Sequence, residues 1–329
     1  MPDAREARPK VCVAMPLEDS LNEDVDAACQ ATRLEPMIPR DELLAALADV
    51  EGVLLGNMIP VDAELFDAAP GLRVVAGVGV GYDNFDVSEA TKRGVAICNT
   101  PDVLTLAVTE LVMGLILSLS RRLLENETYS RSGAWAGSQP RPALGFDLRG
   151  KTLGVVGFGR IGKEVTRRAQ AFGMRTVFND VFTEPPPDAP ESTYRPLADL
   201  LRESDIVSMH TDLNPTSYHL IGERELGLMK PSAYLVNTSR GPVIDQKSLV
   251  GALQSGTIAG AALDVLESEP PGADERIVTL PNVLTFPHIG TSTAETRFAM
   301  RELAVRNLLA VLRGQTPPAC LNPEVLRGG

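Results

Sequence analysis

Histidine, cysteine and tryptophan are scarce in this chain of 329 residues, and their scarcity limits the chemistry that the chain can perform. The four cysteines are scattered, with no Cys-x-x-Cys spacing and no histidine-rich tract beside them; they are Cys12, Cys29, Cys98 and Cys320. A disulfide framework or a zinc site would need closely spaced ligands. We therefore expect reduced thiols, a cytoplasmic location and no bound metal.

Clusters of basic residues and long apolar segments are also absent from the sequence. The chain has 31 lysines and arginines against 43 acidic residues, a formal net charge of −12. Nucleic acids and anionic membrane surfaces bind through basic patches, so we expect neither as a partner. The longest apolar stretch, residues 104–119, contains Glu110 and several hydroxyl groups and is too short to span a bilayer. No secretory signal is apparent, because residues 1–10 are charged and the apolar run behind them is short.

The order of short apolar runs and helical patterns predicts the fold class. The length suggests two domains, and 44% hydrophobic with 22% charged residues is ordinary for globular proteins. In the first hundred residues we expect strands at 11–15, 52–56, 73–76 and 95–98, and helices at 41–49, 61–69 and 87–93. Such alternation is typical of βαβ units on a parallel sheet.

A broad apolar helix and a second alternating series follow. Apolar residues repeat at steps of four, three and four at Leu104, Val108, Leu111 and Leu115. This spacing predicts an amphipathic helix with a wide apolar face, buried between domains or subunits. Further strands and helices are expected at 152–156, 163–172, 175–180, 197–202, 206–210, 234–239, 246–254, 259–265 and 283–286. Ser292 and Glu295 form a capping-box pattern for a last helix, which runs to about Arg313 and returns to the first domain.

A glycine motif in this second series is the strongest single signal in the chain. It follows the strand at 152–156 and has the spacing of a GxGxxG turn, with Gly157, Gly159 and Gly162. The first glycine permits a tight turn, the second lets the backbone approach a pyrophosphate, and the third lets the next helix pack on the strand. The amides of Arg160 and Ile161, where that helix begins, would face the phosphates. A glycine-rich structural turn is the alternative interpretation.

An acid at the end of the next strand supports a dinucleotide site. Asp180 closes the strand at 175–180, eighteen residues after Gly162. An acid near this spacing accepts hydrogen bonds from the adenosine ribose 2′-hydroxyl. Its charge would repel a 2′-phosphate, so the sequence predicts NAD as the cofactor, with NADP less favoured.

Only three histidines are available for acid–base chemistry. His219 stands among polar residues and fits a surface or supporting position. His210 ends an apolar strand and either lines the adenine side of the site or is satisfied within the strand end. His288 follows the last strand of the series, at its carboxyl end, where open α/β sheets bind ligands. Arg240 and Glu269 follow two other strands, so an arginine, a carboxylate and a histidine could converge there.

A second glycine cluster, Gly77-Val-Gly-Val-Gly81, lies in the first part of the chain. It lacks the third glycine of the nucleotide fingerprint, and no long helix starts behind it. One interpretation is a tight loop between a strand and a helix. The other is a nest of backbone N–H groups, those of Val80 and Gly81, that binds a small anion such as a carboxylate.

Several motifs in a fixed order give the chain a resemblance to a known family. They are Val80-Gly-Tyr-Asp-Asn84, Asn99-Thr-Pro-Asp-Val-Leu-Thr105, Gly154 to Gly162, Val236-Asn-Thr-Ser-Arg-Gly241, Ala261-Ala-Leu-Asp-Val265 with Glu269-Pro270, and Pro287-His-Ile-Gly290. On these motifs the chain resembles, over nearly its whole length, the D-isomer-specific 2-hydroxyacid dehydrogenases, and most of all the glyoxylate and hydroxypyruvate reductases. The resemblance implies a flavodoxin-like substrate domain of residues 1–101 and 291–329 and an inserted Rossmann NAD-binding domain of residues 102–290. It also implies a homodimer joined along the nucleotide domains.

The resemblance assigns roles to single residues as well. It implies that Arg240 binds and polarises the substrate, that His288 is the acid/base and that Glu269 is its carboxylate partner. The N–H groups of Val80 and Gly81 would bind the substrate carboxylate. The residues expected to bind the cofactor, with Asp264 on the nicotinamide carboxamide, are Gly157, Gly159, Arg160, Ile161, Gly162, Asp180, His210, Thr211, Thr238, Asp264, His288 and Gly290.

Together these features predict an NAD-dependent oxidoreductase that reduces a small 2-oxo acid, such as glyoxylate or hydroxypyruvate, to the D-2-hydroxy acid. Hydride from NADH reaches the carbonyl carbon, and His288 protonates the oxygen while Glu269 favours the imidazolium form. Arg240 suits the substrate because its planar guanidinium donates to both the carboxylate and the 2-oxo oxygen. Selectivity among side chains would depend on loop residues such as Asn57 and Met58.

Some features leave alternatives open. The segment His210-Thr-Asp-Leu-Asn214 lacks the proline and the threonine of the family's His-x-Pro-x-Thr loop beside the adenosine, which bears on cofactor choice. Some relatives of the family are NADH-sensing corepressors with a similar triad, although no long tail or peptide-docking segment is evident in this sequence. Tyr82 to Asp86 and Gln139-Pro-Arg141 are similar to phosphite dehydrogenase, but Gly77 to Gly81 lacks that enzyme's lysine.

Overall fold

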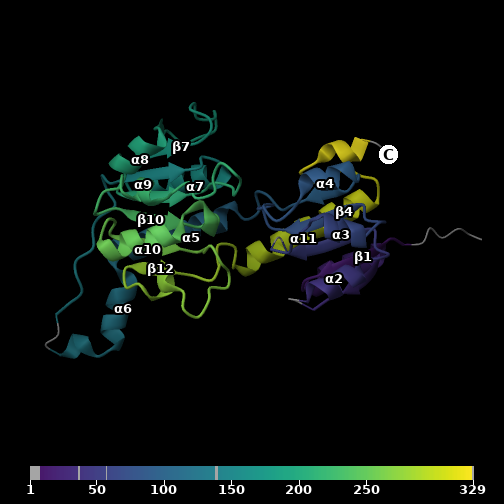
Figure 1. Ribbon diagram of the computed structural model, residues 1–329, viewed down its shortest axis with the longest axis horizontal. Coiled ribbons are helices and arrows are strands. Elements are labelled where there is room, and N and C mark those ends of the chain that lie inside the picture. The colour runs from purple at the N-terminus through teal and green to yellow at the C-terminus, as the bar shows by residue number, and fades with distance from the viewer. Residues whose placement is uncertain (1–7, 36–37, 57, 138–139, 328–329) are drawn as a thin grey trace, which may run out of the picture. The chain divides into compact units, whose positions relative to one another are not determined.

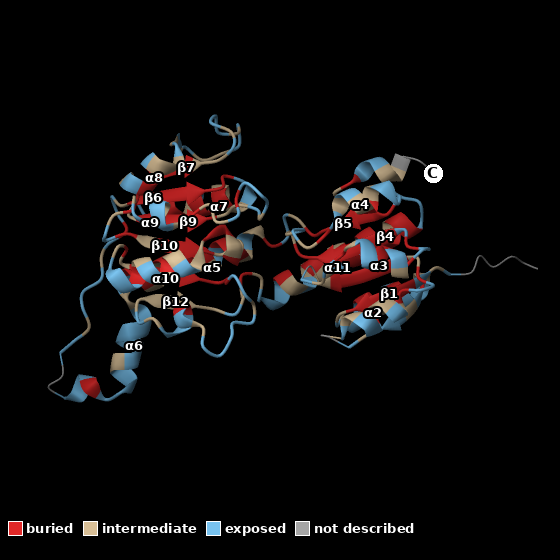
Figure 2. Ribbon diagram, viewed as in Figure 1, coloured by how far each residue is buried: buried red, intermediate tan, exposed pale blue. Residues whose placement is uncertain are grey.

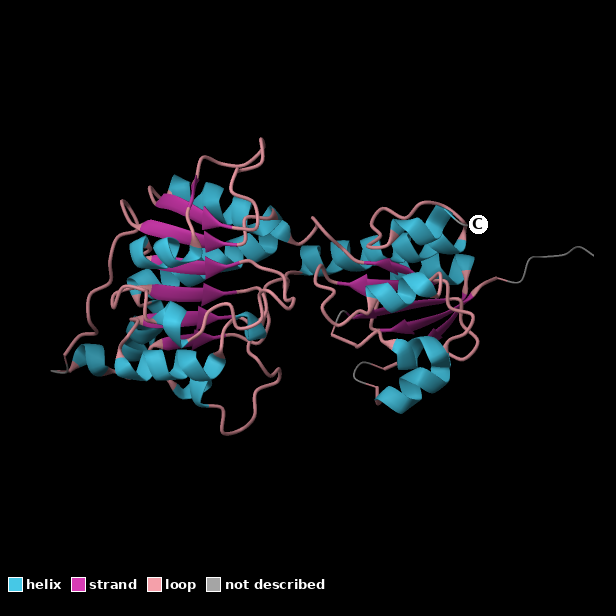
Figure 3. Ribbon diagram, turned by 45° about the horizontal axis from the view of Figure 1, so that its top comes forward, coloured by secondary structure: helices cyan, strands magenta, loops and turns pink. Residues whose placement is uncertain are grey.

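Two α/β units make up the chain, and each has its own parallel sheet (Figure 1). The computed structural model describes residues 8–35, 38–56, 58–137 and 140–327. Unit 1 comprises residues 1–104 and 292–329, and unit 2 comprises residues 105–291. Helices cover the sheets of both units (Figure 3). The predicted fold class, a two-domain α/β protein, is confirmed.

The sheet of unit 1 has five parallel strands in the order β2-β1-β3-β4-β5. The strands are β1 (Lys10–Ala14), β2 (Gln30–Arg33), β3 (Gly52–Gly56), β4 (Val74–Val78) and β5 (Ala96–Cys98). The helices are α1 (Asp19–Ala28), α2 (Arg40–Ala46), α3 (Ala63–Ala68), α4 (Val87–Lys92) and α11 (Ala294–Leu312). The sequence did not predict α1 and β2, because α1 buries only Leu21 and Val25 and β2 is a polar strand at the edge of the sheet.

The central strands of unit 1 are buried, as Figure 2 shows. Parallel sheets have both faces covered by helices, so their strands are continuous apolar runs. Helix α11 packs against β3, β4 and β5, and thus returns the end of the chain to unit 1 as predicted. The predicted cap of α11 was wrong by one residue. Thr293, not Ser292, is the N-cap, because its backbone is extended and its side chain accepts from the amide of Thr296.

The sheet of unit 2 has seven parallel strands in the order β12-β11-β10-β9-β6-β7-β8. They are β6 (Thr152–Val156), β7 (Arg175–Asn179), β8 (Thr193–Tyr194), β9 (Ile206–Met209), β10 (Tyr234–Asn237), β11 (Gly260–Leu263) and β12 (Val283–Thr285). The helices are α5 (Thr105–Arg121), α6 (Leu123–Arg131), α7 (Arg160–Ala171), α8 (Leu197–Glu203), α9 (Glu223–Leu226) and α10 (Gln246–Ser255). The apolar face of α5 packs against α7, β10 and β11 of its own unit. These contacts within unit 2 bury much of that face, including Val108, Val112, Leu115, Ile116 and Leu119.

The strand order of unit 2 brings distant segments to one edge of the sheet. The chain runs outward from β6 to β7 and β8, then crosses back so that β9 pairs with the other side of β6. Ligands bind at such a reversal, beyond the carboxyl ends of the strands. The segments that follow β6, β7, β9, β10 and β11 at this edge contain most of the predicted site residues. In the part of the chain that the structure describes, no helix is long and apolar enough to cross a membrane.

Candidate active site

The glycine turn after β6 has the geometry that the motif predicted. Gly157 has a φ of +92°, and a Cβ atom there would lie 2.6 Å from the carbonyl carbon of His210. A Cβ atom on Gly162 would collide with the carbonyl oxygen of Gly157, so the helix packs on the turn only with glycine there. Helix α7 begins at Arg160, and a Cβ atom on Gly159 would meet no atom within 4 Å. The turn thus leaves open space beside the N-terminus of a helix, where phosphates bind.

Asp180 lies directly beside this turn. One carboxylate oxygen accepts a hydrogen bond of 2.5 Å from the amide of Phe158, inside the glycine motif. The other accepts from the amide of Val181 at 2.7 Å. The charge of Asp180 is therefore held next to the turn, and the side chain is only partly buried.

Two buried hydroxyl groups fit a bound ligand at the same edge. The Oγ1 atoms of Thr211 and Thr238 are buried and make no hydrogen bond within the described residues. Thr211 follows β9 and Thr238 follows β10, so both lie past carboxyl ends of neighbouring strands. Buried polar atoms normally have a partner, and a bound molecule is one explanation for an orphan. Together with the open glycine turn, they fit the dinucleotide that the sequence predicts.

His210 is held as a neutral residue. Its Nε2 atom lies 2.9 Å from the hydroxyl of Ser208, and its amide donates to the carbonyl of Val156. Burial of the ring lowers the pKa of His210 to about 3. A histidine with this pKa is neutral near pH 7 and cannot act as an imidazolium acid. His210 therefore fits a binding or packing position only.

Asp264 organises the loop that carries His288. Its side chain is 1% exposed, and its two oxygens accept from the amides of Ile289 at 2.7 Å and Gly290 at 2.8 Å. Its own carbonyl accepts from the amide of His288 at 3.0 Å. Burial raises the pKa of the Asp264 carboxyl, against the effect of these bonds. The sequence did not predict this supporting role, because the partners lie 25 and 26 residues further along the chain.

His288, Glu269 and Arg240 come together at the ends of three strands. The Nδ1 atom of His288 lies 2.8 Å from a carboxylate oxygen of Glu269, whose other oxygen accepts from the amide of Leu266 at 3.0 Å. Burial alone would raise the pKa of Glu269, but the bonds from His288 and Leu266 and the nearby charge of Arg240 lower it. Glu269 is therefore a carboxylate over the neutral pH range. The arrangement offers an imidazole for proton exchange, a carboxylate bonded to it and a cation for an anionic ligand.

Asn237 holds the backbone of Arg240, a role that the sequence did not predict. Its side-chain amide donates to the carbonyl of Arg240 at 2.8 Å, and its oxygen accepts from the amide of Ser239 at 3.0 Å. Asn237 is 1% exposed and ends β10. The sequence signal that could have identified Asn237 is an amide side chain at the end of an apolar strand, three residues before Arg240.

The second glycine cluster forms a loop at the end of β4 in unit 1. Gly79 has a φ of +152°, and its amide and carbonyl both bond to Thr100, at 3.0 Å and 2.8 Å. The carbonyl of Val80 accepts from the side-chain amide of Asn99 at 2.8 Å. These bonds fix the backbone that precedes the amide of Gly81. The sequence did not assign this supporting role to Asn99 and Thr100.

A family model supplies the identification. The model of the D-isomer specific 2-hydroxyacid dehydrogenase, NAD binding domain, matches residues 113–290. The chain belongs to the D-isomer-specific 2-hydroxyacid dehydrogenases. The resemblance predicted from the motifs is thereby confirmed, and so is a nicotinamide dinucleotide as the type of cofactor.

Named relatives lie close to this dehydrogenase. It is 46% identical over 298 residues to a glyoxylate reductase of Thermococcus gammatolerans, and 89% of each chain is covered. A protein from Thermus thermophilus has a similar structure, with a TM-score of 0.88, 39% identity and coverage of 95% of this chain and 99% of that one. An NADPH-dependent glyoxylate/hydroxypyruvate reductase from Sinorhizobium meliloti, solved with NADP and malonate, matches with a TM-score of 0.85 at 33% identity over 96% of this chain and 97% of that one.

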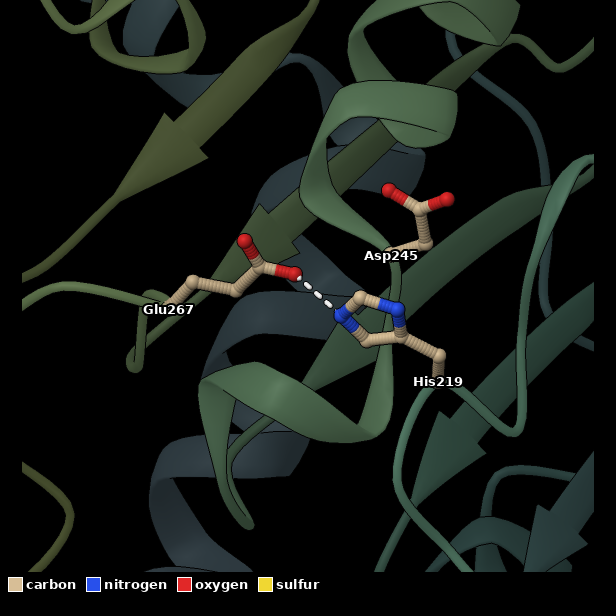
Figure 4. A group of neighbouring side chains, drawn as sticks. All are labelled: His219, Asp245 and Glu267. Carbon is tan, nitrogen blue, oxygen red and sulfur yellow. Dashed lines mark hydrogen bonds and ion pairs between the residues drawn. The ribbon is translucent and has the colours of Figure 1, made fainter.

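The third histidine of the dehydrogenase lies in a separate polar cluster (Figure 4). A ring nitrogen of His219 and one carboxylate oxygen each of Asp245 and Glu267 all lie within 4.8 Å of one another. Glu267 accepts from the ring of His219 at 2.8 Å and from the amide of Gln246 at 3.1 Å. Asp245 is the N-cap of α10 and accepts from the amide of Ser248. Helix capping and the hydrogen bond between His219 and Glu267 account for this cluster.

Two residues named from the sequence lie outside the described part of the chain. Asn57, expected to influence substrate choice, is one, and Gln139, part of the similarity to phosphite dehydrogenase, is the other. Met58 is described and is 53% exposed.

Proposed function

We propose that this dehydrogenase reduces a small 2-oxo acid of the glyoxylate or hydroxypyruvate type to the D-2-hydroxy acid, with NADH as its preferred reductant. The contact between His288 and Glu269 beside Arg240 carries the proposal, since proton donor, charge partner and anion-binding cation stand together. The names of the relatives from Thermococcus gammatolerans and Sinorhizobium meliloti support the substrate class.

When bound, NADH would supply the hydride for the carbonyl carbon. His288 donates a proton to the carbonyl oxygen from Nε2, because Nδ1 is engaged by Glu269. The carboxylate of Glu269 fixes the tautomer and favours the imidazolium before transfer. Arg240 binds the substrate carboxylate and the 2-oxo oxygen with its guanidinium fork. In unit 1, the amides of Val80 and Gly81 are the second group that the family resemblance assigns to the substrate carboxylate.

Asp180 supports NADH over NADPH. Its carboxylate is held against the glycine turn by the amide of Phe158, where a ribose 2′-hydroxyl could donate to it and a 2′-phosphate would be repelled. The reductase from Sinorhizobium meliloti is NADPH-dependent, so relatives differ in this preference. The altered segment from His210 to Asn214 is a second determinant to test.

We propose that the active form is a homodimer and that α6 contributes to its interface. Large apolar side chains on and after this helix are exposed; they are Leu123, Leu124, Trp135 and Leu144, at 49%, 46%, 69% and 95%. Exposed apolar residues that gather in one segment mark interaction sites. Trp135 is the only tryptophan, so its fluorescence should shift to shorter wavelength as the protein concentration, and with it the dimer, increases.

A screen of NADH oxidation tests the proposed reaction. Glyoxylate, hydroxypyruvate, pyruvate, bulkier 2-oxo acids and the reverse reaction with phosphite and NAD should be measured with the same enzyme preparation. Efficient turnover of glyoxylate or hydroxypyruvate supports the proposal. NADH binding without turnover of any 2-oxo acid would favour an NADH-sensing interaction protein, and phosphite oxidation would favour the phosphite alternative.

A further inference from the structure

Cys98 and Cys320 are neighbours in unit 1 although they are far apart in the sequence. The amide of Leu321 donates to the carbonyl of Ile97 at 2.8 Å, and the amide of Ile97 donates to the side-chain oxygen of Asn322 at 2.8 Å. These bonds hold the chain around residue 320 along the end of β5. Cys98 and Cys320 each adjoin one residue of the bonded pair Ile97 and Leu321, so the two cysteines lie on neighbouring segments.

The two sulfur atoms differ in exposure and in acidity. Cys98 is fully buried, whereas Cys320 is partly exposed and lies 3.5 Å from the side-chain oxygen of Asn322. The hydrogen bond from Cys98 lowers the pKa of Cys320 to about 7, and the same bond, with burial, raises the pKa of Cys98. Cys320, the accessible cysteine, is therefore the more reactive thiolate. The buried thiol of Cys98 is available to react with an oxidised Cys320.

We propose that Cys98 and Cys320 form an oxidation site at which a peroxide produces a reversible disulfide. The thiolate of Cys320 attacks one peroxide oxygen, the O–O bond breaks, and a sulfenic acid and hydroxide form. The hydroxide takes up the proton that Cys320 released on ionisation and becomes water. The sulfur of Cys98 then attacks the sulfenic sulfur, an S–S bond forms, and the hydroxyl group leaves as water with the proton of Cys98. Two thiols lose two electrons and two protons, and one peroxide becomes two waters.

This disulfide would act on the loop at the end of β4. Cys98 is followed by Asn99, whose side chain bonds to the carbonyl of Val80, and by Thr100, which bonds to both backbone groups of Gly79. An S–S bond is about 2.05 Å long, so closing it would pull on the end of β5 that carries these bonds. On the proposed function, in which the Val80 loop binds the substrate carboxylate, the KM for glyoxylate should rise roughly fivefold to tenfold, the effect of weakening one hydrogen bond to an anion.

Peptide mapping of the full-length protein tests the site without reference to catalysis. The protein is treated with hydrogen peroxide, alkylated and digested with trypsin without reductant. Cys98 lies in peptide 94–121 and Cys320 in peptide 314–327, whereas Cys12 and Cys29 share peptide 11–33. We expect a linked species of 94–121 with 314–327 that disappears on treatment with dithiothreitol. It should be absent from Cys320→Ser and retained in the matched control Cys29→Ser.

Recovery of Cys320 as a sulfinic acid or as free thiol, with no linked species from folded wild type, would overturn the proposal. An unchanged KM for glyoxylate in protein that does contain the linkage would refute the effect on the Val80 loop. The linkage is detected by peptide mass and does not depend on turnover. Absence of glyoxylate turnover in the reduced protein would therefore count against the proposed function and not against the oxidation site.

Discussion

The Nδ1 atom of His288 lies 2.8 Å from Oε2 of Glu269, while Oε1 of the same carboxylate accepts from the amide of Leu266. The carboxylate is thus anchored to the backbone on one side and to the imidazole on the other. This geometry fixes the orientation of the ring and directs Nε2 as the nitrogen that can exchange a proton with a substrate.

His288→Ala should remove most of kcat and leave NADH affinity nearly unchanged. A positioned proton donor contributes about 10²- to 10⁴-fold to the rate, whereas the phosphates and ribose are expected to bind at the glycine turn and Asp180. The test is a measurement of kcat for glyoxylate together with a fluorescence titration of NADH. His219→Gln, a change of a histidine in the same unit, is the control and should keep kcat within a few-fold. Near-normal turnover in His288→Ala would mean that another group donates the proton.

Glu269→Gln should move the alkaline limb of the reductive pH–rate profile to lower pH. The pKa of Glu269 is lowered, so the wild-type residue is a carboxylate above about pH 5 and favours the protonated ring that reduction needs. The glutamine removes this charge and keeps the shape. Oxidation needs the neutral ring, so its limb should have the opposite slope and move the same way. Glu267→Gln is the matched control, and an unmoved limb in Glu269→Gln would exclude Glu269 from proton transfer.

Wild-type enzyme should have a kcat/KM for NADH at least about tenfold above that for NADPH, which corresponds to about 1.4 kcal/mol. The reason is the carboxylate of Asp180 beside the glycine turn. Asp180→Ala should narrow the ratio by helping NADPH more than it harms NADH. Steady-state kinetics with both cofactors at fixed glyoxylate provide the ratio, and equal efficiency in the wild type would contradict the assignment.

The substrate should need a carboxylate next to its carbonyl group. Replacing that carboxylate by a neutral amide leaves the guanidinium of Arg240, the proposed substrate-binding cation, without an anion, at a cost of several kcal/mol. Values of kcat/KM for glyoxylate and for its amide measure this difference directly. If simple aldehydes are reduced as fast as glyoxylate, the assigned anion site is wrong.

Asp205→Asn should lower the free energy of unfolding at neutral pH by about 1–3 kcal/mol. Burial opposes the charge of Asp205, but the amide of Thr152 and the ammonium of Lys230, each at 2.9 Å, hold its pKa below the ordinary value. For an acid whose pKa is lowered on folding, this stabilisation is present above about pH 4 and is lost as pH falls through the lowered value. Urea unfolding at several pH values measures it. The control, Asp199→Asn, breaks an exposed pair with Arg202 and should change stability by less than about 1 kcal/mol.

The sequence alone determined the features that depend on local spacing. A GxGxxG turn requires glycine because a Cβ atom at Gly157 or Gly162 would strike backbone, so the motif specifies its own geometry. Strands of a parallel sheet are apolar on both faces, which made most of them visible as short runs. Because carboxyl ends of such strands meet at one edge, the positions of Asp180 and His288 after their strands already placed both at the ligand-binding edge.

Only the tertiary structure decided which side chains support these residues and which distant segments meet. The amides of Ile289 and Gly290 donate to Asp264, and the amide of Leu321 donates to Ile97 beside Cys98; these bonds join residues with no periodic relation in the chain. The buried, unpaired hydroxyls of Thr211 and Thr238 are likewise visible only in the folded structure. Polar strands and helices with few buried residues, such as β2 and α1, were missed for a related reason. Their place is set by the neighbours that they pack against, and a single sequence has no local pattern that records those neighbours.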